Sequence, residues 1–233
     1  MSADALAGLS IIIPALNEAA GIGETLNRLA LCRAQGAEVI VVDGGSTDAT
    51  MERVRAQAVR VIEVPPGRAV QMNAGARASR GALLLFLHAD TALPEEADTL
   101  LAAILRDDTK LWGRFDVRIT GRHWMLRIVA TMMNLRSRIT GIATGDQAIF
   151  VRREVFEAAG GYPTIPLMED IALTHRLNRF AKPVCLSARV MTSGRRWETH
   201  GVMRTIFLMW KLRLAYWAGA DPRQLARRYR NGS

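Results

Sequence analysis

The sequence is poor in cysteine. Only Cys32 and Cys185 occur among 233 residues, and they form neither a CxxC pair nor a cluster with histidines. This spacing excludes a disulfide framework and gives no indication of a cysteine-ligated zinc site. Free thiols persist in a reducing compartment, so we expect the protein in the cytoplasm.

A long apolar run is also missing. The best candidate for a membrane span, residues 202–219, is interrupted by Arg204, Lys211 and Arg213, and three cations are too costly to insert unaided. The N-terminus has Asp4 but no Lys or Arg before its first apolar run, which is unlike a secretory signal. We therefore expect a soluble protein, or one bound peripherally to the inner face of the membrane.

Acidic residues are scarce only near the C-terminus. Residues 189–233 hold ten Arg and Lys against Glu198 and Asp221, and they account for +8 of the net charge of +9. The rest of the chain is nearly neutral, which argues against a nucleic-acid partner. The basic tail suits an anionic membrane surface or phosphate groups. It equally suits solvation, packing on the domain, or contact with a second subunit, so the oligomeric state stays open.

Short apolar runs alternate with helical patterns, and the 49% apolar and 23% charged content is that of a globular protein. The runs at 9–14, 38–43, 60–64 and 83–87 predict strands, and apolar spacing at 17–31, 69–78 and 94–105 predicts helices. This order implies an α/β domain with a mainly parallel sheet. Beyond residue 110 we expect strands at 112–119 and 148–152, and helices at 125–135, 153–159 and 169–180.

Three polar clusters follow predicted strands directly, at residues 14–18, 43–48 and 88–90. Each alone is an ordinary helix cap, but ligands of open parallel sheets bind beyond the carboxyl ends of the strands. Together the clusters predict a ligand site. The phosphate loop GxxxxGK[ST] and a GxGxxG after a strand are both absent. We therefore expect phosphates to be held by a metal ion and basic side chains.

Four motifs carry a family resemblance: SIIIPALNEA, VIVVDGGSTDAT, GRAVQMNAGARASRGALLLFLHADT and GDQAIFVRREVFEAAGGYPTIPLMEDIALTHRL. Over residues 9–200 the chain resembles the family-2 glycosyltransferases, and more narrowly a compact bacterial branch labelled arsenosugar-biosynthesis-associated. The resemblance implies a GT-A, Rossmann-like α/β fold in a single domain. Its nucleotide-sugar half would span about 9–110 and its acceptor half about 111–200, followed by a basic helical tail at about 201–233.

The resemblance also implies a donor site for a nucleotide-diphosphate sugar. Residues expected to line it are Pro14, Ala15, Asn17, Glu18, Asp43, Gly44, Ser46, Arg68, Asn73, Ala89 and Asp90. Asp90 would be the metal-holding carboxylate of the Asp-x-Asp element of the family, with Mn²⁺ or Mg²⁺ as the cofactor. His88 replaces the first Asp. Imidazole suits Mn²⁺ better than Mg²⁺, so His88 is either a ligand or a packed histidine beside the site.

On the acceptor side the resemblance points to Glu169 and Asp170, with Asp170 as the general base and Glu169 as its neighbour. An acceptor hydroxyl needs such a base at neutral pH, and a single displacement implies inversion at the anomeric carbon. Further acceptor or phosphate contacts are expected from Gly145, Asp146, Gln147, Arg195, Arg196 and Trp197. The last three resemble the Gln-x-x-Arg-Trp signature, with Ser193 in the Gln position.

The sequence leaves several points open. The acceptor is either a small molecule or a lipid-linked molecule, and neither the donor sugar nor its base is indicated. One alternative is a nucleotidyltransferase of related fold, although residues 15–18 lack its basic triphosphate loop. Others are a non-catalytic nucleotide-sugar-binding protein and a peripheral membrane-binding protein.

Overall fold

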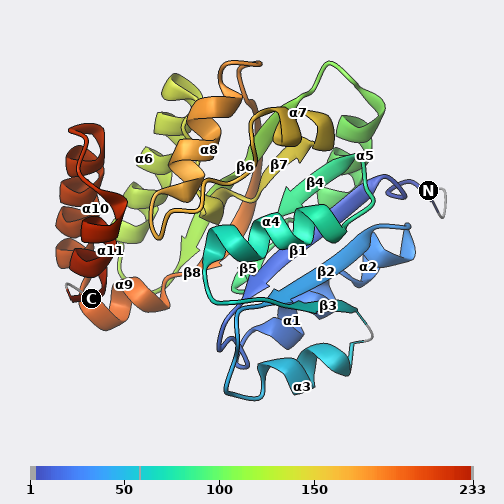
Figure 1. The fold of residues 1–233 in the computed structure, drawn as a ribbon, viewed down its shortest axis with the longest axis horizontal. Helices are drawn as coiled ribbons and strands as arrows, with labels where there is room; N and C mark the ends of the chain where they lie inside the picture. The colour runs from blue at the N-terminus through green and yellow to red at the C-terminus, as the bar shows by residue number, and fades with distance from the viewer. Residues whose placement is uncertain (1–3, 58, 232–233) are drawn as a thin grey trace.

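The computed structural model describes residues 4–57 and 59–231 (Figure 1). Within these residues the chain forms one eight-stranded sheet in the order β3-β2-β1-β4-β7-β6-β8-β5. The strands are β1 (Leu9–Ala15), β2 (Glu38–Asp43), β3 (Arg60–Glu63), β4 (Leu83–Phe86), β5 (Thr91–Ala92), β6 (Trp112–Thr120), β7 (Ile149–Arg152) and β8 (Val184–Ser193). An α/β fold is confirmed.

The first half of the sheet is wholly parallel. Strand β1 pairs with β2 and β4, and β2 pairs with β3, all in parallel. The register sets Ala15 opposite Asp43, so the segments that follow β1 and β2 begin at the same edge. In the second half, β6 and β8 are parallel, whereas β7 runs antiparallel to both β4 and β6. The predicted clusters after the first strands therefore do converge at one edge.

Helices cover both faces of the sheet. They are α1 (Ile22–Arg28), α2 (Ala30–Ala34), α3 (Thr50–Arg55), α4 (Arg68–Ala78), α5 (Ala97–Arg106), α6 (Met125–Thr140), α7 (Arg153–Ala158), α8 (Glu169–Leu177), α9 (Arg195–His200), α10 (Val202–Trp217) and α11 (Pro222–Asn231), with a short 3₁₀ turn, η1 (Gly145–Gln147). The helix predicted at 17–31 was wrong in its start and its continuity. Asn17 has a φ of 56°, which excludes it from a right-handed helix, and the helix begins only at Ile22 and is interrupted at Leu29.

Successive residues of the central strands point into two different apolar clusters. Ile11 and Ile13 belong to one cluster, and Ile12 belongs to the other. Burial on both faces explains why these strands read as continuous apolar runs. Helix α4 lies close to the sheet at Gly75, where a Cβ would meet the side chains of Ile12 and Val42. That close packing fixes the first turn of α4 near the carboxyl ends of β1 and β2.

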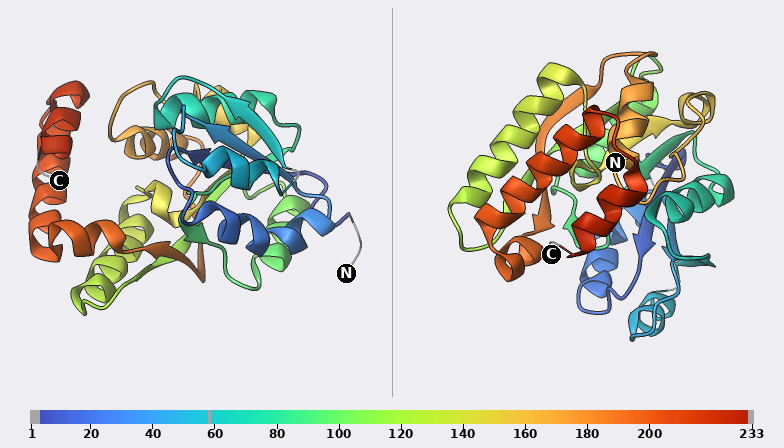
Figure 2. Two further views of the ribbon diagram at one scale, coloured as in Figure 1. Left: turned by 90° about the horizontal axis from the view of Figure 1, so that it is seen from below. Right: turned by 60° about the vertical axis from the view of Figure 1, so that its left-hand side comes forward.

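The C-terminal helices fold back onto the domain. Leu212 of α10 and Leu225 of α11 are buried with Ile142, Met168 and Ile171 in a third apolar cluster. Figure 2 shows α10 and α11 standing beside α6 and α8 at one end of the molecule. Among the residues that the structure describes, none of the helices has the length and apolarity to cross a membrane. Most of the basic tail is thus part of the packed structure.

Candidate donor cleft

A cleft of about 650 Å³ opens at the carboxyl edge of the parallel strands. Both halves of the chain and the tail contribute to it. Its lining is Pro14, Ala15, Leu16, Glu18, Gly67, Arg68, Gln71, His88, Ala89, Asp90, Asp146, Thr192, Ser193, Arg195, Trp197, Thr199, Thr205, Met209 and Tyr229. Ten of the residues expected at a donor, acceptor or metal site therefore lie together: Pro14, Ala15, Glu18, Arg68, His88, Ala89, Asp90, Asp146, Arg195 and Trp197.

The loops after β1 and β2 brace each other behind this cleft. The Asn17 backbone N–H donates to Ser46 Oγ at 2.9 Å, and the Thr47 N–H donates to Asn17 Oδ1 at 2.9 Å. Asp43 is buried, and its Oδ2 accepts the N–H groups of Gly45 and Ser46. Asn17, Asp43, Gly44 and Ser46 lie outside the cleft lining. In this structure they shape the loops that carry the lining residues.

Gln71 is a lining residue that the sequence reasoning missed. Its buried Nε2 donates to the carbonyl oxygens of Ala15 and Val42, both at 2.8 Å. One side chain on α4 thus joins the ends of β1 and β2. A glutamine three and four residues before Ala74 and Gly75, which share its helix face and are buried, was the available signal, since a buried amide needs hydrogen-bond partners.

Two carboxylates, Glu18 and Asp90, line the cleft close to one another. Burial raises the pKa of Glu18, the charge of Asp90 raises it further, and Arg195 opposes both. Arg195 Nη2 lies 3.6 Å from Glu18 Oε2. Among the described residues, only Glu18 of this pair has an arginine within ion-pair distance, so the two acids are short of positive charge. This arrangement fits Mn²⁺ or Mg²⁺, because such an ion is commonly held by one or two carboxylates together with phosphate oxygens.

A complete metal cage does not occur among the described residues, where no three His, Cys, Asp or Glu side chains gather around one point. His88 does not extend the carboxylate pair. Its Nδ1 lies 3.3 Å from Asp146 Oδ1, and its Nε2 is buried without a hydrogen-bond partner. A Cβ on Gly145 would meet that Nε2. Of the two alternatives for His88, this geometry favours the histidine packed beside the site.

Asp146 connects the cleft to the acceptor side. Burial raises its pKa, but the hydrogen bond and charge of His88, followed by the charges of Arg68 and Arg213, outweigh burial and hold the pKa below its ordinary value. Asp146 therefore stays ionised next to Arg68, which itself begins α4.

The acidic pair at the start of α8 is held by contacts from both sides. Glu169 is almost fully buried, with its Oε1 3.7 Å from Arg68 Nη1. Burial and then the charge of Asp170 raise the pKa of Glu169, and Arg68 counteracts them. Asp170 Oδ2 accepts the Gly145 N–H at 2.9 Å. The pair thus adjoins the loop that carries Asp146, although neither acid is part of the cleft lining.

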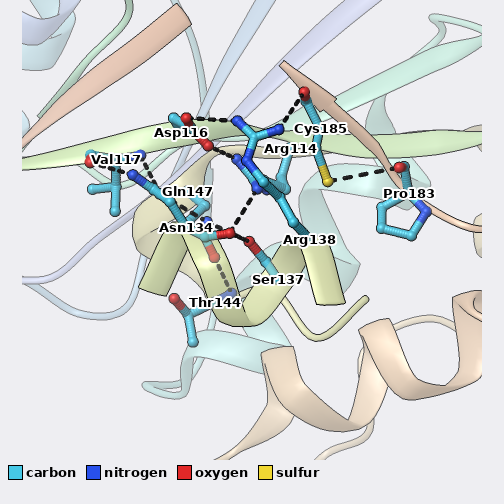
Figure 3. Close-up of polar contacts among 10 residues, drawn as sticks. All are labelled: Arg114, Asp116, Val117, Asn134, Ser137, Arg138, Thr144, Gln147, Pro183 and Cys185. Atoms are coloured by element: carbon cyan, nitrogen blue, oxygen red, sulfur yellow. Dashed lines mark hydrogen bonds and ion pairs between the residues drawn. The ribbon is translucent and has the colours of Figure 1, made fainter. Parts of the chain in front are cut away.

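Two of the expected contact residues have their amides engaged within the fold. Asn73 bonds the carbonyl and the N–H of Tyr162 at 2.8 and 2.9 Å. Gln147 is fully buried and donates to Asn134 and Ser137 (Figure 3). Both amides thus support the fold, and the expectation that these residues contact ligands stays a prediction. The side chain of Arg196 lies outside the described part of the chain.

The arrangement is the GT-A glycosyltransferase fold, as comparison with solved structures confirms. TarS from S. aureus in complex with UDP superposes with a TM-score of 0.65 and 22% identity, over 84% of this chain and 63% of TarS. A mannosyltransferase from Pyrobaculum calidifontis, in complex with GDP-Man and Mn²⁺, gives a TM-score of 0.58 and 25% identity, over 79% of this chain and 56% of that one.

The family follows from the sequence comparison. The profile described as glycosyl transferase family 2 matches residues 10–159, and the chain belongs to this family. It is 33% identical over 165 residues to a PGL/p-HBAD biosynthesis glycosyltransferase of Mycobacterium bovis, covering 66% of this chain and 62% of the relative. An undecaprenyl-phosphate 4-deoxy-4-formamido-L-arabinose transferase of Pseudomonas paraeruginosa is 31% identical, covering 64% of this chain and 48% of that relative.

The chain therefore spans less than two thirds of the length of these curated relatives. The predicted family and fold are confirmed. The narrower arsenosugar label is not supported by these matches and stays a prediction.

Proposed function

We propose that the protein moves a sugar from a nucleoside-diphosphate sugar to an acceptor hydroxyl, with inversion at the anomeric carbon. The observation that carries this proposal is the pairing of charges in the cleft. Glu18 and Asp90 line the cleft close to one another, and Arg68 and Arg195 line the same space. Carboxylates suit a divalent cation and guanidinium groups suit phosphate oxygens, so the cleft has groups for both parts of such a donor.

Asp90, with Glu18 beside it, would hold the Mn²⁺ or Mg²⁺ ion. When bound, the cation stabilises the negative charge that develops on the departing diphosphate. Arg68 and Arg195 add positive charge to the same region, and Pro14, Ala15 and Ala89 supply close backbone and apolar contacts. Two similar solved structures are complexes with UDP and with GDP-Man, which is compatible with a nucleotide in this position.

On the acceptor side, we assign proton removal to Asp170. Its carboxylate is oriented by the Gly145 N–H, and burial together with the charge of Asp170 raises the pKa of the neighbouring Glu169. Removal of the hydroxyl proton by one base, with attack on the face opposite the departing diphosphate, gives inversion in a single displacement.

The acceptor itself is open to two classes. A small molecule fits a cleft bordered by Thr205 and Met209, and a lipid-linked acceptor agrees with the undecaprenyl-phosphate named for one relative. The free thiols of Cys32 and Cys185 favour the reducing cytoplasm as the location.

A ligand screen tests the proposal directly. Thermal unfolding is followed with UDP-, GDP- and dTDP-sugars, each with and without Mn²⁺. A donor at about 100 times its Kd should stabilise the native state by about 2.7 kcal/mol, which is roughly 5–10 °C for a chain of this size. Metal-dependent stabilisation by one nucleotide class, followed by release of the nucleoside diphosphate, supports the proposal. Binding without any turnover or slow hydrolysis would instead indicate a non-catalytic binding protein, and no stabilisation by any donor would remove its basis.

A further inference from the structure

Helix α6 carries a stripe of large apolar side chains that face solvent. Trp124, Ile128, Met132, Leu135 and Ile139 recur every three or four residues, with exposed fractions between 45% and 73%. At 100° per residue the five fall within a sector of about 80°. The buried residues of the same helix, Leu126, Ala130, Met133 and Ser137, lie opposite. The stripe is therefore a second apolar face that the fold does not use.

Helix α10, some eighty residues later, repeats the pattern. Met203, Phe207, Trp210, Leu214 and Trp217 follow each other at intervals of four, three, four and three, and are 49% to 70% exposed. They also span a sector of about 80°; Thr205 and Leu212, which are buried, lie opposite, and buried Val202 lies to one side. Like α6, this helix has one apolar face in the core and another in solvent.

The two helices lie side by side, and together they concentrate the exposed apolar surface of the molecule. They contact each other and run next to one another on one face (Figure 2, right). Of the fourteen large apolar side chains exposed in the described chain, ten belong to these two stripes. Scattered exposed apolar residues are normal, whereas ten that are concentrated on two adjoining helices indicate an interaction surface. We call it the α6–α10 face.

The charge around this face has one sign. Residues 117–145 contain five Arg and no Asp or Glu, and residues 199–220 contain Arg204, Lys211 and Arg213, again without an acid. On the helical wheel, exposed Arg127 flanks the α6 stripe, while exposed Arg204 and Lys211 flank the α10 stripe. Pairing two copies through this face would bring like charges together. An occupant that is apolar within and negative at its surface satisfies both features.

We propose that the α6–α10 face docks on an anionic phospholipid bilayer. Apolar and aromatic side chains would enter the boundary between headgroups and acyl chains, and the flanking cations would meet the lipid phosphates. Trp124, Trp210 and Trp217 suit this boundary, because an indole ring combines an apolar body with one N–H donor. The inference goes beyond the proposed glycosyl transfer and does not depend on it. Thr205 and Met209 of α10 also line the donor cleft, so docking would hold the cleft at the lipid surface.

Vesicle sedimentation with the full chain tests the docking. The parent protein should bind vesicles of phosphatidylcholine with 30% phosphatidylglycerol at least tenfold more tightly than pure phosphatidylcholine vesicles, and rising salt should weaken the binding. Two double variants address the stripes separately: Met132→Gln with Ile139→Gln on α6, and Phe207→Gln with Leu214→Gln on α10. Each should lower affinity at least tenfold. Leu31→Gln, an exposed leucine on α2, is the matched control and should bind like the parent.

The outcomes separate this surface from the alternatives. All five substituted side chains are exposed, and thermal unfolding of each variant checks that the fold is kept. Equal binding to neutral and anionic vesicles, or no binding, overturns the proposal. If the α10 double variant loses vesicle binding and the α6 double variant keeps it, the two-helix face is wrong and the tail alone binds the bilayer. A parent protein that ignores vesicles but forms a dimer, which the stripe variants convert to monomer, shows that a second copy covers the face instead.

Discussion

Replacing Asp170 with Asn separates the proposed chemistry from donor binding. We expect two effects, a loss of fold stability and a loss of turnover. The two carboxylate oxygens accept the N–H groups of Gly145 at 2.9 Å and Ile171 at 2.7 Å. Asparagine has one acceptor oxygen, so one N–H loses its partner. An unsatisfied donor costs about 1–3 kcal/mol, which for a chain of this length lowers Tm by roughly 2–12 °C.

The chemical effect of Asp170→Asn should be larger and of a different kind. Loss of a general base lowers turnover by roughly 10²–10⁴-fold, equivalent to about 2.7–5.4 kcal/mol of the barrier. Donor affinity should change little, because the proton is transferred only in the transition state. The measurements are release of the nucleoside diphosphate and donor binding, both taken well below the Tm of the variant.

A matched control isolates the loss of a hydrogen bond from the loss of a base. Asp98 is buried in α5, and its oxygens accept the Gln35 side-chain amide and the Thr99 N–H. Asp98→Asn should therefore lose stability to a similar extent while keeping parental turnover. If Asp170→Asn binds the donor normally and turns over near the parental rate, Asp170 is not the base, and Glu169 becomes the candidate.

Three further substitutions test other parts of the site. Asp90→Asn should abolish the Mn²⁺-dependent part of donor stabilisation in a thermal-shift assay. Glu52→Gln, at an exposed glutamate, is the control and should keep it. Unchanged metal dependence in Asp90→Asn would contradict the metal assignment. The folded-state pKa of Glu169 is raised above its ordinary value of 4.5, so ionisation of Glu169 destabilises the fold as pH rises through that pKa. Glu169→Gln should therefore raise Tm at neutral pH, and this gain should vanish below about pH 4.5. A difference in Tm that stays constant with pH would refute the burial argument. Gly145→Ala places a Cβ against His88 and should cost about 1–3 kcal/mol in urea unfolding, as overpacking does, so an unchanged midpoint would show that His88 moves freely.

Local sequence pattern predicted the first half of the fold well. The apolar runs that became β1, β2 and β4 are buried on both faces, and such strands stand out in any window of the sequence. Residues 184–193 were not recognised as a strand, and β8 has mostly half-buried or exposed positions, with only Val190 and Thr192 buried. Its place beside β6 depends on pairing across more than sixty residues, which no local pattern contains.

The candidate site was predictable where it follows strands and unpredictable where it depends on the tail. The clusters after β1 and β4 placed Glu18 and Asp90 at one edge, because parallel strands end together. Within those clusters, however, spacing does not distinguish a residue that faces the cleft from one that braces a loop. Asn17 and Glu18 are neighbours, and only Glu18 lines the cleft. Thr205 and Tyr229 had no signal at all, since their contribution depends on how α10 and α11 fold back.

This return of the tail has a consequence for how the site arises during synthesis. The cleft is lined from Pro14 near one end of the described chain to Tyr229 near the other. On the ribosome, β1, β2, β3 and β4 can pair as soon as about 90 residues have emerged, because their partners are all within that stretch. The wall formed by Thr205, Met209 and Tyr229 must wait until α10 and α11 have emerged and packed on Ile142 and Ile171. A nascent chain would thus pair its first four strands early and complete the lining of its cleft only after residue 229 has emerged.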